Sequence, residues 1–317
     1  MRRYLVKDHQ NKDSIVERHN ILRGLIRLTR WNEHVVFVIP LTLLGALLAV
    51  YLNDLSLDWH LFALLAANVI AVTCGFMIND IEDAPDDARD PERAARNPIA
   101  SGEVPTNIGY AVYYLLTGVA LILYFLSGII ILLISLVMMV LSHLYSWRPV
   151  RLKALPVVDL LSHSVLLGGF LILSGYLMYA TTPGKAWWVI ASATFGSIYG
   201  QFYNQLRDFE TDKAAGLLNT AILLGETRTR GVMYVTIGIA IICLVIAILS
   251  QVFPIGLIIA AVIGFFVSAR YRGRTDMRGS PAVEASGAMQ IRGLILLNFI
   301  IFSWFVYVLA SQMFTVA

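Results

Sequence analysis

Two short stretches of the sequence carry the same set of oxygen-bearing side chains. In each stretch an asparagine is followed, at four-residue intervals, by two aspartates. The first motif is Asn79, Asp83 and Asp87 (residues 79–87), and the second motif is Asn204, Asp208 and Asp212 (residues 204–212). Because residues four apart share one face of a helix, each motif can present an amide and two carboxylates in one direction. Such oxygens are hard ligands, which favours a magnesium site.

The charge of the two motifs limits what they can bind. Two facing sets of carboxylates repel each other in a low-dielectric cleft unless divalent cations lie between them. Mg²⁺ is usually held by one or two carboxylates together with phosphate oxygens and water. The motifs therefore predict Mg²⁺, about two ions, and a phosphate-bearing ligand. The alternative is a pair of solvated acidic loops, but two matched copies favour the cation site. Pro85 lies inside the first motif, so a helix could break there.

Basic residues and one tyrosine could contact the phosphate oxygens. The candidates are Tyr145, Arg148, Arg151 and Lys153 in the stretch LYSWRPVRLK (residues 144–153), and Arg96. The alternative for the stretch is an ordinary basic loop at a membrane surface. Arg27 and Arg30 precede the first apolar segment, and they could line the site or anchor the chain at the interface.

A further ionisable pair lies within apolar sequence. Asp159 and His163 are four residues apart in VVDLLSH (residues 157–163). An ionisable group at membrane depth is a functional hypothesis by default. The pair could bind a second substrate or move its proton. A structural pair, satisfied by a tyrosine or by the backbone, is the alternative.

The composition indicates where these residues must be positioned. The chain has 317 residues, of which 58% are hydrophobic and 14% charged, whereas a soluble domain carries about 25% charged residues. This excludes an ordinary soluble domain and predicts a multi-pass integral membrane protein, with no nucleic-acid partner. Cys74 and Cys243 lie inside apolar runs and are expected to be buried thiols. No cleavable signal peptide is recognisable in the polar, basic first thirty residues.

A spanning helix needs about 20 mostly apolar residues. By that criterion the sequence predicts nine spans, at 34–52, 60–78, 108–125, 128–146, 157–179, 187–203, 231–250, 252–270 and 293–313. All Lys and Arg residues except Lys185 then fall on one side of the membrane. The positive-inside rule places that side, with the N-terminus, in the cytoplasm. We expect an all-α protein of the plasma membrane, with a basic cytoplasmic segment (1–33) and one transmembrane domain (34–317). Its active site should lie on the cytoplasmic side.

The motifs resemble those of the UbiA superfamily of intramembrane prenyltransferases. NDIEDAPDD (79–87) is similar to the family's first motif, and DFETD (208–212) to its second. RNPIASG (96–102) resembles the segment that follows the first motif, with Asn97 in place of an expected arginine. The sequence around Lys153 is similar to that of the chlorophyll-synthase and carotenoid-elongase branches of the family, where that lysine would bind phosphate.

The resemblance implies two pseudo-repeated helical halves around a central cavity that opens toward lipid. It implies Mg²⁺-dependent transfer of an isoprenyl group from an isoprenyl diphosphate to a lipophilic acceptor, through an allylic carbocation. The residues it makes catalytic are Asp83, Asp87, Asp208, Asp212 and Lys153. A terpene cyclase or carotenoid elongase of the same superfamily, or a secondary transporter, are the alternatives. Residues 270–292 could cover the site or lie on an anionic membrane surface.

Overall fold

The computed structural model describes residues 21–276 and 281–316. In this part of the chain the structure is helical, and its only β pairing is the bridge between Thr275 and Pro281. The basic residues Arg2, Arg3, Lys7, Lys12, Arg18 and Arg278 lie outside the described residues. The thiols of Cys74 and Cys243 are buried and form no disulfide, as expected.

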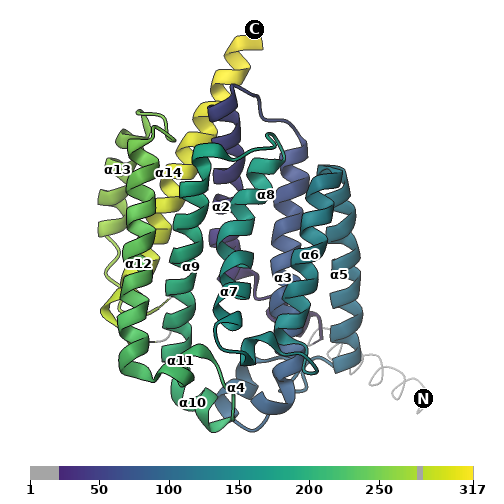
Figure 1. Ribbon diagram of the computed structural model, residues 1–317. Coiled ribbons are helices and arrows are strands. Elements are labelled where there is room, and N and C mark those ends of the chain that lie inside the picture. The colour runs from purple at the N-terminus through teal and green to yellow at the C-terminus, as the bar shows by residue number, and fades with distance from the viewer. Residues whose placement is uncertain (1–20, 277–280, 317) are drawn as a thin grey trace, which may run out of the picture.

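The helices form a bundle whose long members run side by side (Figure 1). The long helices are α2 (Trp31–Asn53), α3 (His60–Asp87), α5 (Thr106–Ser127), α6 (Ile129–Ser146), α9 (Trp187–Arg207), α12 (Glu226–Leu249) and α14 (Ala285–Val316). The shorter ones are α4 (Pro91–Arg96), α7 (Val158–Ser164), α8 (Phe170–Leu177), α10 (Phe209–Ala214), α11 (Thr220–Leu224) and α13 (Leu257–Ala269). Single turns are η1 (Leu152–Ala154), η3 (Gly184–Ala186) and the π-helical η2 (Val165–Gly169), which joins α7 to α8.

Seven helical segments of the described chain are long and apolar enough to cross a membrane, so this is a multi-pass integral membrane protein. They correspond to seven of the nine expected spans. The expected span at 187–203 is helix α9, whose polar residues near its end, such as Gln201 and Gln205, lower its hydropathy. The expected span at 252–270 contains α13, which has only 13 residues. The count of nine and the orientation therefore stay predictions.

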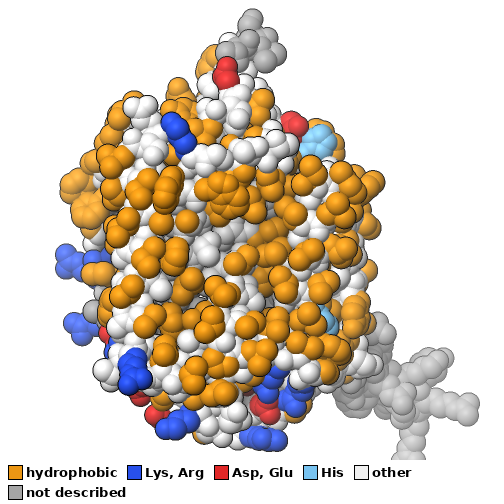
Figure 2. Space-filling view, in the orientation of Figure 1, with side chains coloured by type: hydrophobic (Ala, Val, Ile, Leu, Met, Phe, Trp, Pro, Cys, Tyr) orange, Lys and Arg blue, Asp and Glu red, His pale blue; other side chains and the backbone are white. Residues whose placement is uncertain are grey.

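The surface has the polarity of a membrane protein. Apolar side chains cover the middle of the molecule, and most Lys and Arg side chains visible on this face gather where α4 and α10 lie (Figure 2). We call this the polar end. Large side chains such as Ile122 on α5 and Ile259 on α13 are more than half exposed. Only lipid can solvate such a surface without a large free-energy cost.

The backbones of α2 and α8 approach each other closely where the two helices cross. A Cβ added to Gly45 would lie 1.9 Å from the carbonyl oxygen of Ile172, and one added to Gly175 would lie 2.2 Å from that of Thr42. Only glycine permits this approach of two backbones, which is common between membrane helices. The crossing fixes α8, and through it η2 and α7, against the first half of the bundle.

Both motifs occur at helix ends at the polar end. Helix α3 does not break at Pro85 but continues to Asp87. Side chains hold its last turns, since Arg148 Nε donates to the Glu82 carbonyl at 2.7 Å and Asn97 Nδ2 to the Asp80 carbonyl at 2.7 Å. Asp208 lies between α9 and α10, where helical hydrogen bonds pass through it.

Candidate functional site

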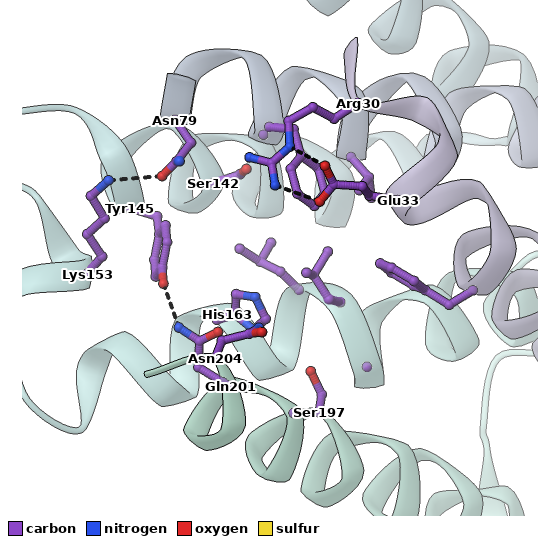
Figure 3. A pocket seen from close by; sticks show the side chains of 18 of the residues that line it. Arg30, Glu33, Asn79, Ser142, Tyr145, Lys153, His163, Ser197, Gln201 and Asn204 are labelled. Atoms are coloured by element: carbon purple, nitrogen blue, oxygen red, sulfur yellow. Dashed lines mark hydrogen bonds and ion pairs between the residues drawn. The ribbon is translucent and has the colours of Figure 1, made fainter. Parts of the chain in front are cut away.

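The six motif side chains line one cavity of about 1110 Å³. The first motif reaches it from α3, and the second from the end of α9 and from α10. Figure 3 shows Asn79 and Lys153 at one side of this cavity, with Asn204, Gln201 and His163 on another wall. The structure thus brings the two motifs together, as the sequence predicted.

Cations from the stretch before α7 contact the first motif. Lys153 Nζ lies 2.9 Å from Asn79 Oδ1 and 2.5 Å from Asp83 Oδ2. Arg151 Nη2 lies 3.2 Å from Asp83 Oδ1 and 3.1 Å from Asp86 Oδ2. Lys153 is nearly buried, so its ammonium needs these oxygens as partners. The contacts place both cations where they can reach an anion held at the first motif.

An arginine of α4 links the two motifs. Arg93 lies 3.3 Å from Asp212 and 3.9 Å from Asp87. Helix α4 starts here because Asp90 caps it, accepting from the backbone N–H groups of Glu92 and Arg93, and because Pro91 suits the first helical position. The cap therefore aims Arg93 into the space between the motifs.

Burial changes the acidity of Asp212. The pKa of this carboxyl is raised to about 6, because loss of water around it and the negative charge of Asp208 together outweigh the opposing positive charges of Arg93 and Lys153. Asn219 Nδ2 also donates to Asp212 Oδ2 at 3.2 Å. A carboxyl in this state gains from a neighbouring positive charge, such as a divalent cation.

Asn97 orients the last aspartate of the first motif. Its Nδ2 lies 2.9 Å from Asp87 Oδ2, and its Oδ1 accepts from the backbone N–H groups of Ile99 and Ala100 at 2.9 and 3.3 Å. The side chain is almost fully buried. Although asparagine replaces the arginine expected at this position, it holds Asp87 toward the cavity.

The donor set fits Mg²⁺ shared with a phosphate ligand. Among the described residues, no group of three or more His, Cys, Asp or Glu side chains is arranged to hold a metal ion by itself. The cavity wall instead offers carboxylate and amide oxygens from two sides, with Arg93, Arg151 and Lys153 among them. Mg²⁺ is usually bound by few carboxylates plus phosphate oxygens and water. The residues that would hold it are Asn79, Asp83, Asp87, Asn204, Asp208 and Asp212.

Away from the motifs the cavity becomes apolar. Its lining there includes Leu41, Val72, Met139, Leu166 and Leu171. At one point the wall carries polar side chains that form hydrogen bonds with one another. There Tyr124 donates to Asn68, and Asn68 donates to Thr42 and Ser174, at 2.8 to 3.0 Å. The cavity can therefore hold a charged head at the motifs and an apolar chain beyond them.

Two expected binding residues do not line the cavity. Asp159 is fully buried outside it and accepts from the Thr220 backbone N–H at 2.8 Å and from Gln205 at 2.6 Å, so it holds α11 against α9. Arg148 pairs with Asp86 at 2.9 Å and with the end of α3. Backbone groups and neighbouring side chains take up the polar groups of both residues, which favours a structural role, and contact of either residue with a substrate stays an untested prediction. Tyr145 and His163 do line the cavity, and Gln201 donates to Tyr145 at 3.0 Å.

The remaining candidates also reach the site. Arg96, Arg27 and Arg30 line the cavity, which favours the site over an interfacial anchor for the last two. Residues flanking the undescribed part of 270–292 pack on α9. Arg207 lies 2.9 Å from Asp276, and the Val283 N–H lies 3.2 Å from the Tyr203 hydroxyl. Whether this segment is a cover or a membrane-surface loop stays a prediction.

Sequence reasoning missed three residues of the site, namely Arg93, Glu33 and Asn97. The signal for Arg93 was present, since Asp90 and Pro91 are a helix start that places Arg93 and Arg96 one turn apart. Glu33 follows Arg30 by three residues, a spacing that pairs side chains on a helix. Asn97 was noted only because it replaces an arginine in the segment RNPIASG, and its contacts with Asp87 and the Asp80 carbonyl depend on the fold of the chain.

Comparisons with known proteins agree with this geometry. The model of the UbiA prenyltransferase family matches residues 38–291. A 4-hydroxybenzoate octaprenyltransferase of Shewanella sp. (strain MR-4) is 28% identical over 162 residues, which are 50% of this chain and 54% of the relative. A lycopene elongase/hydratase of Haloarcula japonica is 31% identical over 189 residues, 56% of this chain and 57% of the relative. The matches thus span little more than half of these relatives.

Solved structures share the fold. A UbiA homolog from Archaeoglobus fulgidus bound to GPP and Mg²⁺ superposes with a TM-score of 0.68 at 20% identity, covering 90% of this chain and 99% of that one. The apo structure of a UbiA homolog from Aeropyrum pernix K1 gives 0.67 at 17% identity, covering 87% and 98%. These likenesses establish the bundle architecture.

Proposed function

Because the chain belongs to the UbiA prenyltransferase family, we propose that it transfers an isoprenyl group from an isoprenyl diphosphate to a lipophilic acceptor. The transfer is Mg²⁺-dependent and takes place inside the bundle. The names of two relatives, an octaprenyltransferase and an elongase, and the GPP and Mg²⁺ bound by the Archaeoglobus fulgidus homolog support this class of reaction.

One observation carries the proposal. The two acidic motifs face one cavity that has cations among its carboxylates and an apolar chamber beyond them. A transporter offers no reason for matched Asn-Asp-Asp sets at one end of the bundle. An amphiphile with a diphosphate head and a hydrocarbon tail matches both halves of the cavity in charge and polarity.

The acidic and basic residues of the site would have different roles in the reaction. Mg²⁺, when bound by the motif oxygens, supplies positive charge to the diphosphate oxygens. Lys153, Arg151 and Arg96 would stabilise the negative charge that develops when the bond between C1 and oxygen breaks and its electron pair leaves with the diphosphate. Asn97 holds Asp87 in place, and Arg93 keeps α4 against both motifs. The apolar lining keeps water from the allylic cation until the acceptor attacks and a proton leaves.

The proposal extends to topology. We propose nine spans in two pseudo-repeated halves, with the N-terminus and the polar end in the cytoplasm and the protein in the plasma membrane. The distribution of Lys and Arg supports this orientation. Single cysteines placed near Arg89 and Arg228 should react with an impermeant reagent only from the cytoplasmic side, and one near Lys185 only from outside. Reaction of the first two from opposite sides would contradict it.

The function is tested by mass balance. Purified protein in lipid nanodiscs receives labelled geranylgeranyl diphosphate, an extract of its native membrane lipids, and either Mg²⁺ or EDTA. We expect diphosphate and a prenylated lipid in equal amounts with Mg²⁺ and neither with EDTA. Release of diphosphate without a prenylated or cyclised product would show that the protein is a diphosphatase. A cyclic hydrocarbon product would show that it is a cyclase.

A further inference from the structure

The cavity contains an arginine, Arg30, whose positive charge is already paired with carboxylates of the protein. Arg30 Nε lies 3.0 Å from Glu33 Oε1 and its Nη2 lies 2.6 Å from Oε2, which is a two-pronged ion pair. Its remaining amino group, Nη1, lies 3.1 Å from Asp80 Oδ1, and the guanidinium carbon lies 4.7 Å from the centre of the Phe76 ring. A fork of this kind is the usual protein partner of a carboxylate. Here Glu33 occupies it.

The pair lies where the cavity meets the surface of the bundle. Figure 3 shows Arg30 and Glu33 across the cavity from Lys153 and Tyr145. Glu33 also lines an open groove between α2 and α14, whose other lining residues include Val36, Phe299 and Phe302. The groove and the cavity share Asn32, Glu33 and Leu294. A molecule that reaches the cavity from this groove therefore passes Glu33.

The charges around this wall do not favour a second anion. One guanidinium faces two carboxylates, those of Glu33 and Asp80. The other cavity-lining cations with carboxylate partners lie toward the motifs or their flanking loops. These are Arg27 with Glu103, Arg93 with Asp212, Arg151 and Lys153 with Asp83, and Arg207 with Asp208. Within the described residues, Arg96 has no ion pair, and it follows the first motif, where the diphosphate is proposed to bind.

We propose that Glu33 occupies the Arg30 guanidinium and thereby prevents it from binding an anionic acceptor. The acceptor of this protein is then an uncharged lipophilic molecule. This rests on the prenyl transfer proposed above and names the acceptor class for the same site. A carboxylate acceptor would have to displace Glu33 from Arg30 while facing Asp80, and like charges at such distances repel. An uncharged acceptor meets an apolar groove and a neutralised wall, and reacts through a hydroxyl or its π electrons with loss of a proton.

The test compares two probes that differ only in charge. They are 4-hydroxybenzoate and its uncharged methyl ester, and their affinities are measured by equilibrium dialysis on full-length protein in nanodiscs with Mg²⁺ and a non-cleavable donor. We expect the wild-type protein to bind the acid more weakly than the ester. In Glu33→Gln the affinity for the acid should rise about 10- to 100-fold, the range of a freed charge-assisted hydrogen bond, and that for the ester should change little.

Matched variants show whether the gain belongs to Arg30. Glu284→Gln removes one of the two carboxylate partners of Arg230, which lies outside the cavity, and should leave the acid-to-ester ratio at its wild-type value. Adding Arg30→Gln to Glu33→Gln should abolish the gain. If Glu33→Gln does not fold, the wild-type ratio alone decides.

Two results would overturn the inference. One is a wild-type protein that prefers the acid, and the other is a Glu33→Gln protein with an unchanged ratio. Loss of acid binding in Arg96→Ala would then assign the carboxylate to Arg96. Failure of the proposed function would appear elsewhere, as absence of Mg²⁺-dependent diphosphate release from the donor, whichever probe the protein binds.

Discussion

The guanidinium of Arg93 lies 3.3 Å from the carboxylate of Asp212, although 119 positions separate them in the chain. The same side chain lies 3.9 Å from Asp87. One arginine of the short helix α4 therefore contacts the last aspartate of each motif. This contact makes the two motifs parts of one site.

Loss of a single carboxylate from either motif should disable turnover. Asp83→Asn and Asp208→Asn each remove a charged oxygen ligand but keep the shape of the side chain. We expect turnover to fall by about 100-fold or more, with partial recovery at high Mg²⁺. The measurement is turnover across a Mg²⁺ titration. The control is Asp54→Asn, at the C-terminal end of α2 and away from both motifs, and it should keep wild-type turnover. Near-normal turnover of the motif variants at low Mg²⁺ would leave the acidic clusters as solvated loops.

Loss of a cation should have a smaller effect that Mg²⁺ does not repair. Lys153→Ala leaves the motif oxygens in place but removes an ammonium next to Asp83, and a charge-assisted hydrogen bond of about 1.5–3 kcal/mol corresponds to a 10- to 100-fold loss. Arg148→Ala is the contrast, because Arg148 does not line the cavity. It should lower the melting temperature while turnover stays within about threefold. Recovery of Lys153→Ala by added Mg²⁺ would argue against this division of roles.

The binding of Mg²⁺ should depend on pH through Asp212. Its pKa is raised to about 6, so the ion-free protein gains stability as the pH falls through 6 and the carboxyl takes up a proton. Mg²⁺ must displace that proton, so its affinity should rise with pH, by up to about tenfold per unit below the pKa, and level off above it. Calorimetric titrations at several pH values measure this. In Asp212→Asn the rise near pH 6 should disappear, and a persisting rise would assign it to another group.

The approach of α2 to α8 should tolerate no added methyl group. Gly45→Ala places a Cβ against the Ile172 carbonyl, and overpacking of this kind costs about 1–3 kcal/mol or more. We expect a lower melting temperature in detergent. Gly118→Ala in α5 is the control, since nothing lies within 4 Å of its added Cβ. Alanine should be neutral or stabilising there. Equal melting temperatures of the two variants would show that the crossing can relax.

The sequence predicted those features of the structure that depend on residues close together in the chain. Long apolar runs gave the spanning helices, and four-residue spacing put Asn79, Asp83 and Asp87 on one face of α3. Their meeting with the second motif also followed, because two acidic sets need a shared cation. The roles of Asp159 and Arg148 could not be predicted in this way. The partners of Asp159 include Thr220, which is 61 positions away, and Arg148 contacts the end of α3 and does not line the cavity. Such contacts depend on how the helices assemble.

The most direct test of the account is a double-mutant cycle on donor binding. The affinity of a non-cleavable geranylgeranyl thiodiphosphate is measured with and without Mg²⁺ for wild type, Asp83→Asn, Asp208→Asn and the double variant. If both motifs hold one metal–diphosphate unit, each single change should abolish most of the Mg²⁺-dependent affinity, and the double variant should lose little more. Donor binding that needs no Mg²⁺, or losses that add fully between the two positions, would contradict a single site built from both motifs.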